Sequence, residues 1–247
     1  MEKMEIKLKT YKKEADYSYA LGASVVVELL QNRPRDCLGV IFSPDYTDRG
    51  GIIEGLCGKH KIPAETNQKL VNMLSPKENC YVAAAFSKCA HTLSQGKSHV
   101  VLDRPSDMGN LGAIMRSCAG FGLEEIAIIG NGADAFHPKT VRASMGAFFH
   151  VKTQNFASIR GYLDIYRDNR EIYTFMLKGE HALHSLAIGE SGVCSLVFGN
   201  EASGLDYETY KGIGKSVVIE HSDRIDSLAL PTAVGIALFA LSRPSRF

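Results

Sequence analysis

SHVVLDRPSDMGNLGAIMRSCAGFGLEEIAIIG, running from Ser98 to Gly130, is the stretch that decides the fold. SHVVLD and EEIAIIG are short apolar runs typical of buried strands, and NLGAIMRSCAGFG between them has helical spacing and ends at Gly122. Two strands joined by a helix in this way form a βαβ unit, whose strands lie parallel in one sheet. The stretch therefore predicts a parallel α/β fold.

The same alternation continues toward the C-terminus. EIYTFML, CSLVFG and KSVVIE predict strands, and KTVRASMGAFF, FASIRGYLDIYRDN and SLALPTAVGIALFALSR predict helices. A parallel sheet of this kind is covered by helices on both faces. Ligands bind such sheets beyond the carboxyl ends of the strands, so we expect a site in the loops after VVLD, LVFG and VVIE.

The first part of the chain predicts a smaller α/β unit. We expect helices over DYSYALGASVVVELL (16–30), GGIIEGLCGKH and AETNQKLVNMLS, and strands over CLGVIFS and YVAAAFS. HTLSQGKSH follows, and its polar residues without an apolar period are typical of a linker. The sequence thus predicts two domains, residues 1–95 and 96–247.

Composition excludes several classes of protein. The 247 residues are 45% hydrophobic with a formal net charge of +1, which is typical of a globular protein and does not decide for or against nucleic acid. The six cysteines form no CxxC pair and no Cys/His cluster, so we expect reduced thiols and no metal site. The uncharged run from Ser227 to Ser242 is shorter than the roughly 20 residues that cross a membrane, so a buried helix is expected there. The N-terminus is charged and lacks the apolar core of a secretory signal, so we expect a cytoplasmic protein.

Each of the three loops carries residues that suit a ligand site. In the first loop, Asn110 stands at the strand-to-helix turn, and Arg116 follows in the helix. The loop lacks G-x-G-x-x-G, which argues against a dinucleotide-dependent dehydrogenase. Glu201 follows the second strand, where a carboxylate can hold an arginine or a ligand amine, and Ser227 opens the last helix. Taken singly, Glu201 and Ser227 are also compatible with a plain turn and a helix N-cap.

Taken together, in this order and spacing, the loops resemble the signature motifs of the SpoU, or TrmH-type, RNA 2′-O-ribose methyltransferases of the SPOUT superfamily. The resemblance rests on DRPSDMGNLGAIMRS, LVFGNEASGL and the VVIE…DSLAL segment, with HPKTVRASMGAFFH between the first two, and covers about residues 98–243. The first unit is more weakly similar to the small RNA-binding domain that precedes the catalytic domain in many members.

The resemblance implies a fold, a cofactor and an assembly. It implies a deep C-terminal trefoil knot whose loops bind S-adenosylmethionine, with the adenosyl part against the main chain of Gly199, Ile219 and Leu228. It also implies a homodimer through the knot region, an rRNA or tRNA substrate that spans both subunits, and methyl transfer to a ribose 2′-hydroxyl without a metal.

The resemblance also implies roles for individual side chains. Arg116 matches the family's catalytic arginine, and because arginine is a poor base at neutral pH we expect it to grip an RNA phosphate and stabilise the forming alkoxide. Asn110 would orient Arg116 or its loop, and Glu201 would pair with Arg116 or position the substrate. Ser227 would hydrogen-bond within the site, and Arg142 would contact RNA or the second subunit.

The third motif departs from the family pattern. Ala229 stands where the family has an asparagine, Glu220 and His221 replace a Pro-Met pair, and in the first motif Met108 replaces a proline. Losing one amide donor from a polar site costs from about tenfold to a thousandfold in rate if that donor acts in the transition state. The alternative is therefore a weakened or inactive relative that still binds RNA or cofactor.

Overall fold

The computed structural model describes residues 8–48, 50–75, 80–186 and 192–242. It divides into two compact units. The first comprises Met1–Cys89 with Asp134–His150, and the second comprises Ala90–Ala133 with Val151–Phe247. Residues 134–150 thus group with the first unit, although the motif order places them inside the expected catalytic domain. The division into an RNA-binding domain and a catalytic domain stays a prediction.

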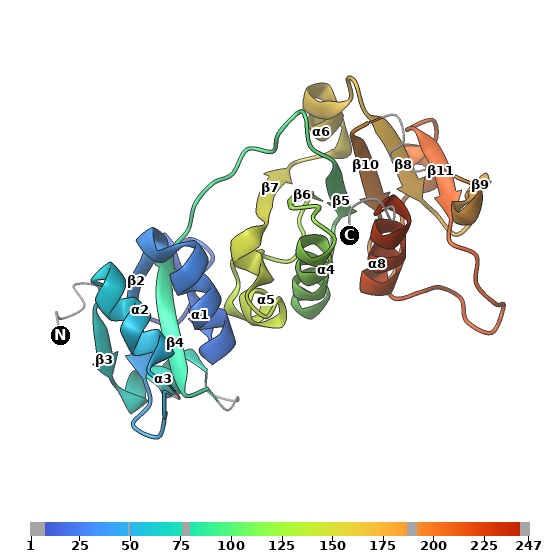
Figure 1. Ribbon diagram of the computed structural model, residues 1–247. Helices are drawn as coiled ribbons and strands as arrows, with labels where there is room; N and C mark the ends of the chain where they lie inside the picture. Colours follow the sequence, from blue (N-terminus) through green and yellow to red (C-terminus); the bar gives the residue numbers. More distant parts are fainter. Residues whose placement is uncertain (1–7, 49, 76–79, 187–191, 243–247) are drawn as a thin grey trace. The chain divides into compact units, whose positions relative to one another are not determined.

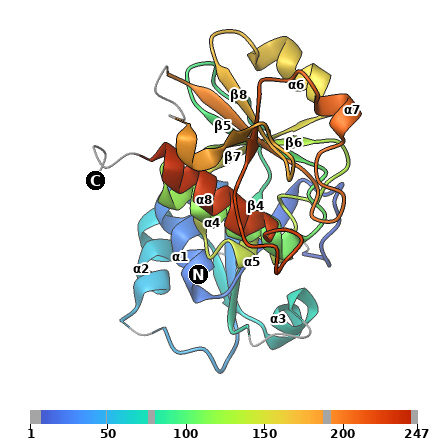
Figure 2. The same ribbon diagram turned by 90° about the vertical axis from the view of Figure 1, so that its right-hand side faces the viewer.

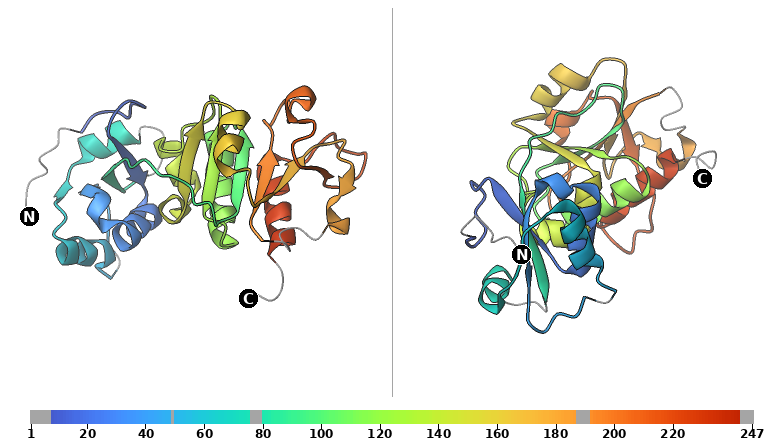
Figure 3. Two further views of the ribbon diagram at one scale, coloured as in Figure 1. Left: turned by 90° about the horizontal axis from the view of Figure 1, so that it is seen from above. Right: turned by 60° about the vertical axis from the view of Figure 1, so that its left-hand side comes forward.

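The first unit is built on a four-stranded sheet in the order β1-β4-β2-β3. β1 and β2 both pair antiparallel with β4, and β2 pairs parallel with β3. The strands are β1 (Tyr17–Leu21), β2 (Cys37–Phe42), β3 (Ala64–Thr66) and β4 (Val82–Ser87). The helices are α1 (Ala23–Asn32), α2 (Ile52–His60), α3 (Gln68–Leu74) and α5 (Pro138–Ala143). Figure 3 shows α1, α2 and α3 in blue to teal in two views. α5 packs against β1, which explains why its segment groups with this unit.

Two helices expected in this unit are shorter than their sequence pattern suggests. The helix expected over residues 16–30 is divided at Gly22 into β1 and α1, because Tyr17–Leu21 pairs along its length with β4. The helix expected over residues 64–75 likewise gives its first residues to β3. In both cases strand pairing with a distant segment overrides a helical spacing of apolar residues.

The second unit is built on a seven-stranded sheet in the order β7-β6-β5-β10-β8-β11-β9, in which every pair is parallel (Figure 1). The parallel-sheet α/β fold expected from the sequence is therefore confirmed. The strands are β5 (His99–Asp103), β6 (Glu125–Ile129), β7 (Lys152–Phe156), β8 (Glu171–Phe175), β9 (His181–Ala182), β10 (Cys194–Phe198) and β11 (Lys215–Val218). All residues of β5, β6 and β10 are buried, as a sheet covered on both faces requires.

Helices cover both faces of this sheet. Figure 2 shows α4 (Met108–Gly120) and α8 (Leu230–Leu241) side by side on one face, and α6 (Ile159–Tyr166) and α7 (Tyr207–Tyr210) on the other. α6 contributes Tyr162 and Tyr166 to the core, where they pack on apolar residues of the central strands.

The helix boundaries in the second half of the chain also differ from expectation. The helix expected over residues 156–169 begins only at Ile159, because Lys152–Phe156 forms the edge strand β7. The helix expected over KTVRASMGAFF breaks near Met145, whose φ of 53° is left-handed. The final helix begins at Leu230 rather than Ser227, and the last expected residue, Arg243, lies outside the described residues.

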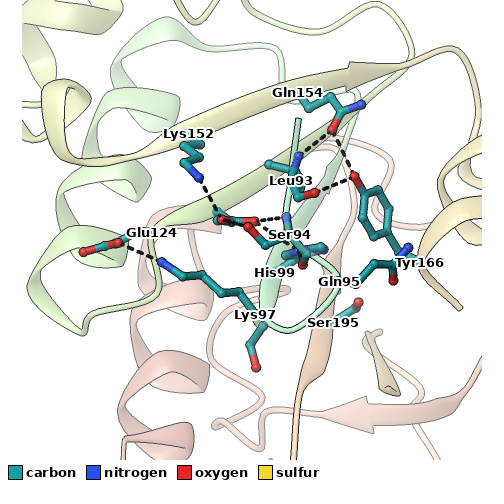
Figure 4. Close-up of polar contacts among 12 residues, drawn as sticks. Leu93, Ser94, Gln95, Lys97, His99, Glu124, Lys152, Gln154, Tyr166 and Ser195 are labelled. Carbon is teal, nitrogen blue, oxygen red and sulfur yellow. Dashed lines mark hydrogen bonds and ion pairs between the residues drawn. The ribbon is translucent and has the colours of Figure 1, made fainter. Parts of the chain in front are cut away.

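A buried polar network fixes the segment before β5 to the amino ends of the sheet (Figure 4). His99 and Glu125 are both fully buried. Arg170 Nη1 donates to His99 Nδ1 at 2.8 Å, so the ring proton sits on Nε2 and faces the Ser94 carbonyl at 3.1 Å. The Glu125 carboxylate accepts from the Ser94 amide and hydroxyl. These bonds require a neutral His99.

The neutral state of His99 predicts acid sensitivity. Burial, followed by the nearby positive charge of Arg170, lowers the pKa of His99 to about 4. An unfolded histidine has a pKa near 6.5, so between these values the unfolded chain binds more protons and the free energy of unfolding falls as the pH falls. Lowering the pH from 7 to 5 should remove up to about 2 kcal/mol, measured by urea unfolding.

The matched control uses an exposed histidine of the same unit. His99→Gln should reduce the difference in unfolding free energy between pH 7 and pH 5, and His181→Gln, at an exposed position on β9, should leave it unchanged. An equal pH dependence in all three proteins would refute the assignment.

Candidate functional site

A pocket of about 420 Å³ lies at the carboxyl ends of β8, β10 and β11, within the size range of small-molecule sites. Three chain segments and the start of α8 form its walls. The lining residues are Phe175–Lys178 after β8, Phe198–Leu205 and Tyr207 after β10, Val217–Ile219 and His221 after β11, and Ser227, Leu228, Leu230 and Ala233 at α8. The pocket thus has the position in which parallel sheets bind ligands.

Five of these lining residues are site residues that the sequence predicted. The three residues expected to bind the cofactor, Gly199, Ile219 and Leu228, all line the pocket, as do Glu201 and Ser227. Aromatic side chains stand at the carboxyl ends of β8 and β10. The rings of Phe175 and Phe198 stack with their centroids 4.4 Å apart and an angle of 11° between their planes. The pocket therefore combines apolar side chains with exposed loop backbone.

The residues after β8 were missed by the sequence analysis. Phe175 ends β8, and Met176, Leu177 and Lys178 follow it into the pocket wall. The sequence predicted a site only in the loops after β5, β10 and β11. The missing signal was topological, because β8 lies between β10 and β11 in the sheet, so its carboxyl end must face the same pocket.

Gly199 is fixed by close packing of the loop that follows β10. A Cβ at this position would lie 2.0 Å from the carbonyl carbon of Gly204, a distance that no side chain tolerates. The Gly204 amide in turn donates to the Asn200 carbonyl at 2.9 Å. Only glycine therefore allows this loop to fold back on itself beside the pocket.

Glu201 joins this loop to the loop after β5. Its carboxylate accepts from the Ser106 amide at 3.0 Å, the Ser106 hydroxyl at 2.9 Å and the Asn110 side-chain amide at 3.2 Å. A weaker bond of 3.3 Å comes from the Asp107 amide. Partial burial alone would raise the pKa of Glu201, but these donors outweigh it and lower the pKa to about 2. Glu201 is therefore a permanent anion held by the amino end of α4.

Asn110 and Arg116 make no hydrogen bond with each other in the described part of the chain. The side-chain amide of Asn110 donates to Glu201, and the cap of α4 is Asp107, whose carboxylate accepts from the Asn110 amide at 2.8 Å. Six helical residues turn the chain by about 600°, so Arg116 points to another side of α4. Arg116 is exposed, and within the described residues its guanidinium makes no hydrogen bond or ion pair. The expected pairing of Glu201 with Arg116 is replaced by the Glu201–Asn110 bond.

The start of α8 lacks a side-chain cap. The N-cap residue is Ala229, and no side chain bonds the first amides of the helix. Pro231 in the first turn removes one amide that would need a partner. The position at which the family has asparagine is therefore the N-cap of the helix that closes the pocket.

The remaining expected site residue lies in the other unit. Arg142 is a half-buried residue of α5 in the first unit, whereas every residue that lines the pocket belongs to the second.

In the described ranges, no cluster of three or more His, Cys, Asp or Glu side chains could hold a metal. No helix within those ranges is long and apolar enough to cross a membrane.

The segment that carries these motifs matches a known protein family. The model of the SpoU rRNA methylase family matches residues 97–239. The 23S rRNA (guanosine(2553)-2′-O)-methyltransferase RlmP of Bacillus subtilis is 24% identical over 65% of this chain and 64% of its own length. An uncharacterized tRNA/rRNA methyltransferase of Synechocystis is 26% identical over 58% of this chain and 52% of its own. The matches thus span from about half to just under two thirds of these relatives.

Solved structures resemble most of the chain, including both units. An AdoMet-bound rRNA methyltransferase from Sinorhizobium meliloti superposes with a TM-score of 0.78 and 25% identity, over 92% of this chain and 87% of that one. The SpoU methyltransferase AviRb from Streptomyces viridochromogenes has the same TM-score at 18% identity, over 92% and 90% of the two chains, which shows a shared fold.

The Glu201 contacts predict a measurable loss of stability. In Glu201→Gln an amide group would face the donors of Ser106 and Asn110, so we expect the free energy of unfolding to fall by about 1–3 kcal/mol. Glu208→Gln, at an exposed site on α7, is the matched control and should change it by less than about 0.5 kcal/mol. Urea unfolding at pH 7 measures both, and equal values for the two variants would contradict the role given to Glu201.

Proposed function

Because the chain belongs to the SpoU rRNA methylase family, we propose that it is an S-adenosylmethionine-dependent methyltransferase that methylates a ribose 2′-hydroxyl of rRNA or tRNA. The observation that carries the proposal is the convergence of the second and third motif loops on one pocket, with the first motif loop bound to them through Glu201. The names of the relatives support the RNA substrate, and RlmP and a solved 2′-O ribose methyltransferase support the 2′-hydroxyl as acceptor.

The pocket suits the cofactor in size and chemistry. About 420 Å³ bounded by Phe175, Phe198 and loop backbone fits a flat adenine ring that needs apolar contact and edge hydrogen bonds. We expect the main chain around Gly199, Ile219 and Leu228 to hold the adenosyl part, and Ser227 to hydrogen-bond beside it. S-adenosylmethionine supplies an electrophilic methyl group when bound, so no metal is required.

The protein's part in the reaction is to position and stabilise. The acceptor hydroxyl must lie in line with the methyl group, and its oxygen becomes negative as its proton leaves. We assign Arg116 to the RNA phosphate and the forming alkoxide, since a guanidinium remains charged at neutral pH. Glu201 and Asn110 act as positioning residues that fix the loop before α4, and Arg142 is assigned to RNA on the first unit.

An exposed Arg116 fits a site that two subunits complete. α4 packs against α8, and α8 exposes Ile236 at 37% and Phe239 at 70% of their surface. Apolar side chains exposed together commonly mark a protein interface. We therefore propose a homodimer through the α4 and α8 face, in which Arg116 acts at the junction of the subunits.

We also propose the family's trefoil knot in the segment that follows β10. The chain passes from β10 across β8 to β11 and then returns to pack α8 against α4. A Cβ at Gly179 would lie 2.4 Å from the Val217 carbonyl carbon, so the two segments pass each other in direct backbone contact. Such close crossing supports a threaded chain.

Transfer of labelled methyl from S-adenosylmethionine to total cellular RNA tests the activity. The wild-type protein should label RNA, and nuclease digestion should release the label as a 2′-O-methylnucleoside. Arg116→Ala should lower the rate by at least about a hundredfold, because it removes a charge that acts in the transition state. Arg167→Ala, at an exposed site at the end of α6, should retain the wild-type rate. Label on a base, or in no RNA pool, would contradict the proposal.

Restoring the family asparagine separates an efficient enzyme from a weakened one. Ala229→Asn should cap α8 and raise the free energy of unfolding by about 1 kcal/mol. If the missing amide limits catalysis, the rate of methyl transfer should also rise tenfold or more. Ala229→Ser is the matched control, because it caps the helix without supplying an amide. Equal rates for the two variants would show that Ala229 does not weaken the enzyme.

A further inference from the structure

A second cavity, of about 520 Å³, lies at the carboxyl ends of β5, β6 and β7. It opens at the same edge of the sheet as the first pocket, and Ser203 lines both. The function proposed above uses none of its polar side chains. The principal ones are Arg104, Ser158, Asp206 and Thr209.

Arg104 is held at this cavity in an unusual conformation. Its φ of 49° is left-handed, which is costly for a residue with a side chain and persists only where the surroundings impose it. Its amide donates to the Ile129 carbonyl at 3.0 Å, and its own carbonyl accepts from the Asn200 side-chain amide at 2.7 Å. The backbone of Arg104 is thus fixed from β6 and from the loop after β10.

The guanidinium of Arg104 is fixed as well. Its Nε and Nη2 donate to the two oxygens of Asp103, each at 3.2 Å, and Asp103 is buried and also bonded by the Tyr210 hydroxyl. The Arg104 side chain still has half of its surface exposed. Arg104 lines the cavity, and Nη1 of its oriented guanidinium takes no part in these two bonds.

A carboxylate faces the same cavity. Asp206 caps α7, and its Oδ2 accepts from the amide and hydroxyl of Thr209. These bonds lower the pKa of Asp206, so it is ionised at neutral pH. Among the described residues nothing donates to its Oδ1. The cavity therefore presents fixed donors and a fixed acceptor.

We propose that this second cavity binds a base of single-stranded RNA next to the methylated nucleotide, with a preference for guanine. The inference rests on the proposed function, because an RNA strand whose ribose lies at the first pocket can pass Ser203 into the second. Guanine presents the acceptors O6 and N7, which arginine recognises, and the donors N1–H and N2–H, which suit a carboxylate. Single-stranded bases are the usual targets of sequence-specific RNA recognition.

Binding of two labelled RNAs tests the proposal. The probes are a fluorescein-labelled 12-nucleotide oligouridine and the same RNA with one central guanosine, compared by fluorescence anisotropy at one salt concentration. The wild-type protein should bind the guanosine-containing RNA about tenfold more tightly, as one well-made base contact provides. Arg104→Lys keeps the charge but loses the planar fork, and Asp206→Asn keeps a helix cap but loses the charge. Both should abolish the preference.

The controls make the same chemical changes outside the cavity. Arg167→Lys and Asp164→Asn, at exposed positions near α6, should keep the wild-type preference. A wild-type protein that binds both RNAs equally, or an Arg104→Lys variant that retains the preference, would overturn the inference. So would an Arg104→Lys variant that weakens both RNAs equally, since this indicates only a phosphate contact.

Calorimetric titration with S-adenosylmethionine separates this inference from the proposed function. The wild-type protein and the Arg104→Lys and Asp206→Asn variants should all bind the cofactor with equal affinity, because the first pocket is unchanged. Absence of cofactor binding by the wild-type protein would refute the proposed function. Normal cofactor binding without a guanine preference would refute only the second site.

Discussion

The arrangement of the site depends on the hydrogen bonds that the Glu201 carboxylate accepts. It lies after β10 and accepts hydrogen bonds from Ser106, in the loop between β5 and α4, and from Asn110 in the first turn of α4. These two segments are far apart in sequence but adjacent in space, because β5 and β10 are neighbours in a parallel sheet. A parallel arrangement brings the carboxyl ends of both strands to one edge, and the carboxylate then fixes one loop relative to the other.

This arrangement concentrates local strain beside the pocket. Asn200 binds the carbonyl of Arg104, whose left-handed backbone is costly, and Gly199 approaches the backbone of Gly204 too closely for any side chain. Such features persist only when the surrounding structure imposes them. The opposite edge of the sheet has a different character: there the buried network of His99, Glu125 and Arg170 joins the chain before β5 to the core. The amino edge is thus closed by buried hydrogen bonds, whereas the carboxyl edge carries both pockets.

The sequence predicted most of the second unit because its signals are local. β5, α4 and β6 each consist of one apolar run or one helical period, so pattern and structure agree. The edge strand β7, Lys152–Phe156, was missed because four of its five residues are polar, and β1 was read as helix because its pairing with β4 is not local. The same limit applies to the site. The lining residues Gly199, Ile219 and Leu228 came from motif order, whereas the partner of Glu201 could not be predicted.

The partner of Glu201 also changes how Arg116 should be understood. A carboxylate that already accepts three hydrogen bonds from the loop before α4 and a fourth from Asn110 in the first turn of α4 has little capacity left for a guanidinium. No carboxylate among the described residues therefore neutralises Arg116, and its exposed charge is available to an anion. An RNA phosphate is such an anion, and electrostatic attraction to phosphates accounts for much of the affinity of proteins for nucleic acids. In the function we propose, Glu201 binds Asn110 and the amino end of α4, which leaves the Arg116 guanidinium for the RNA.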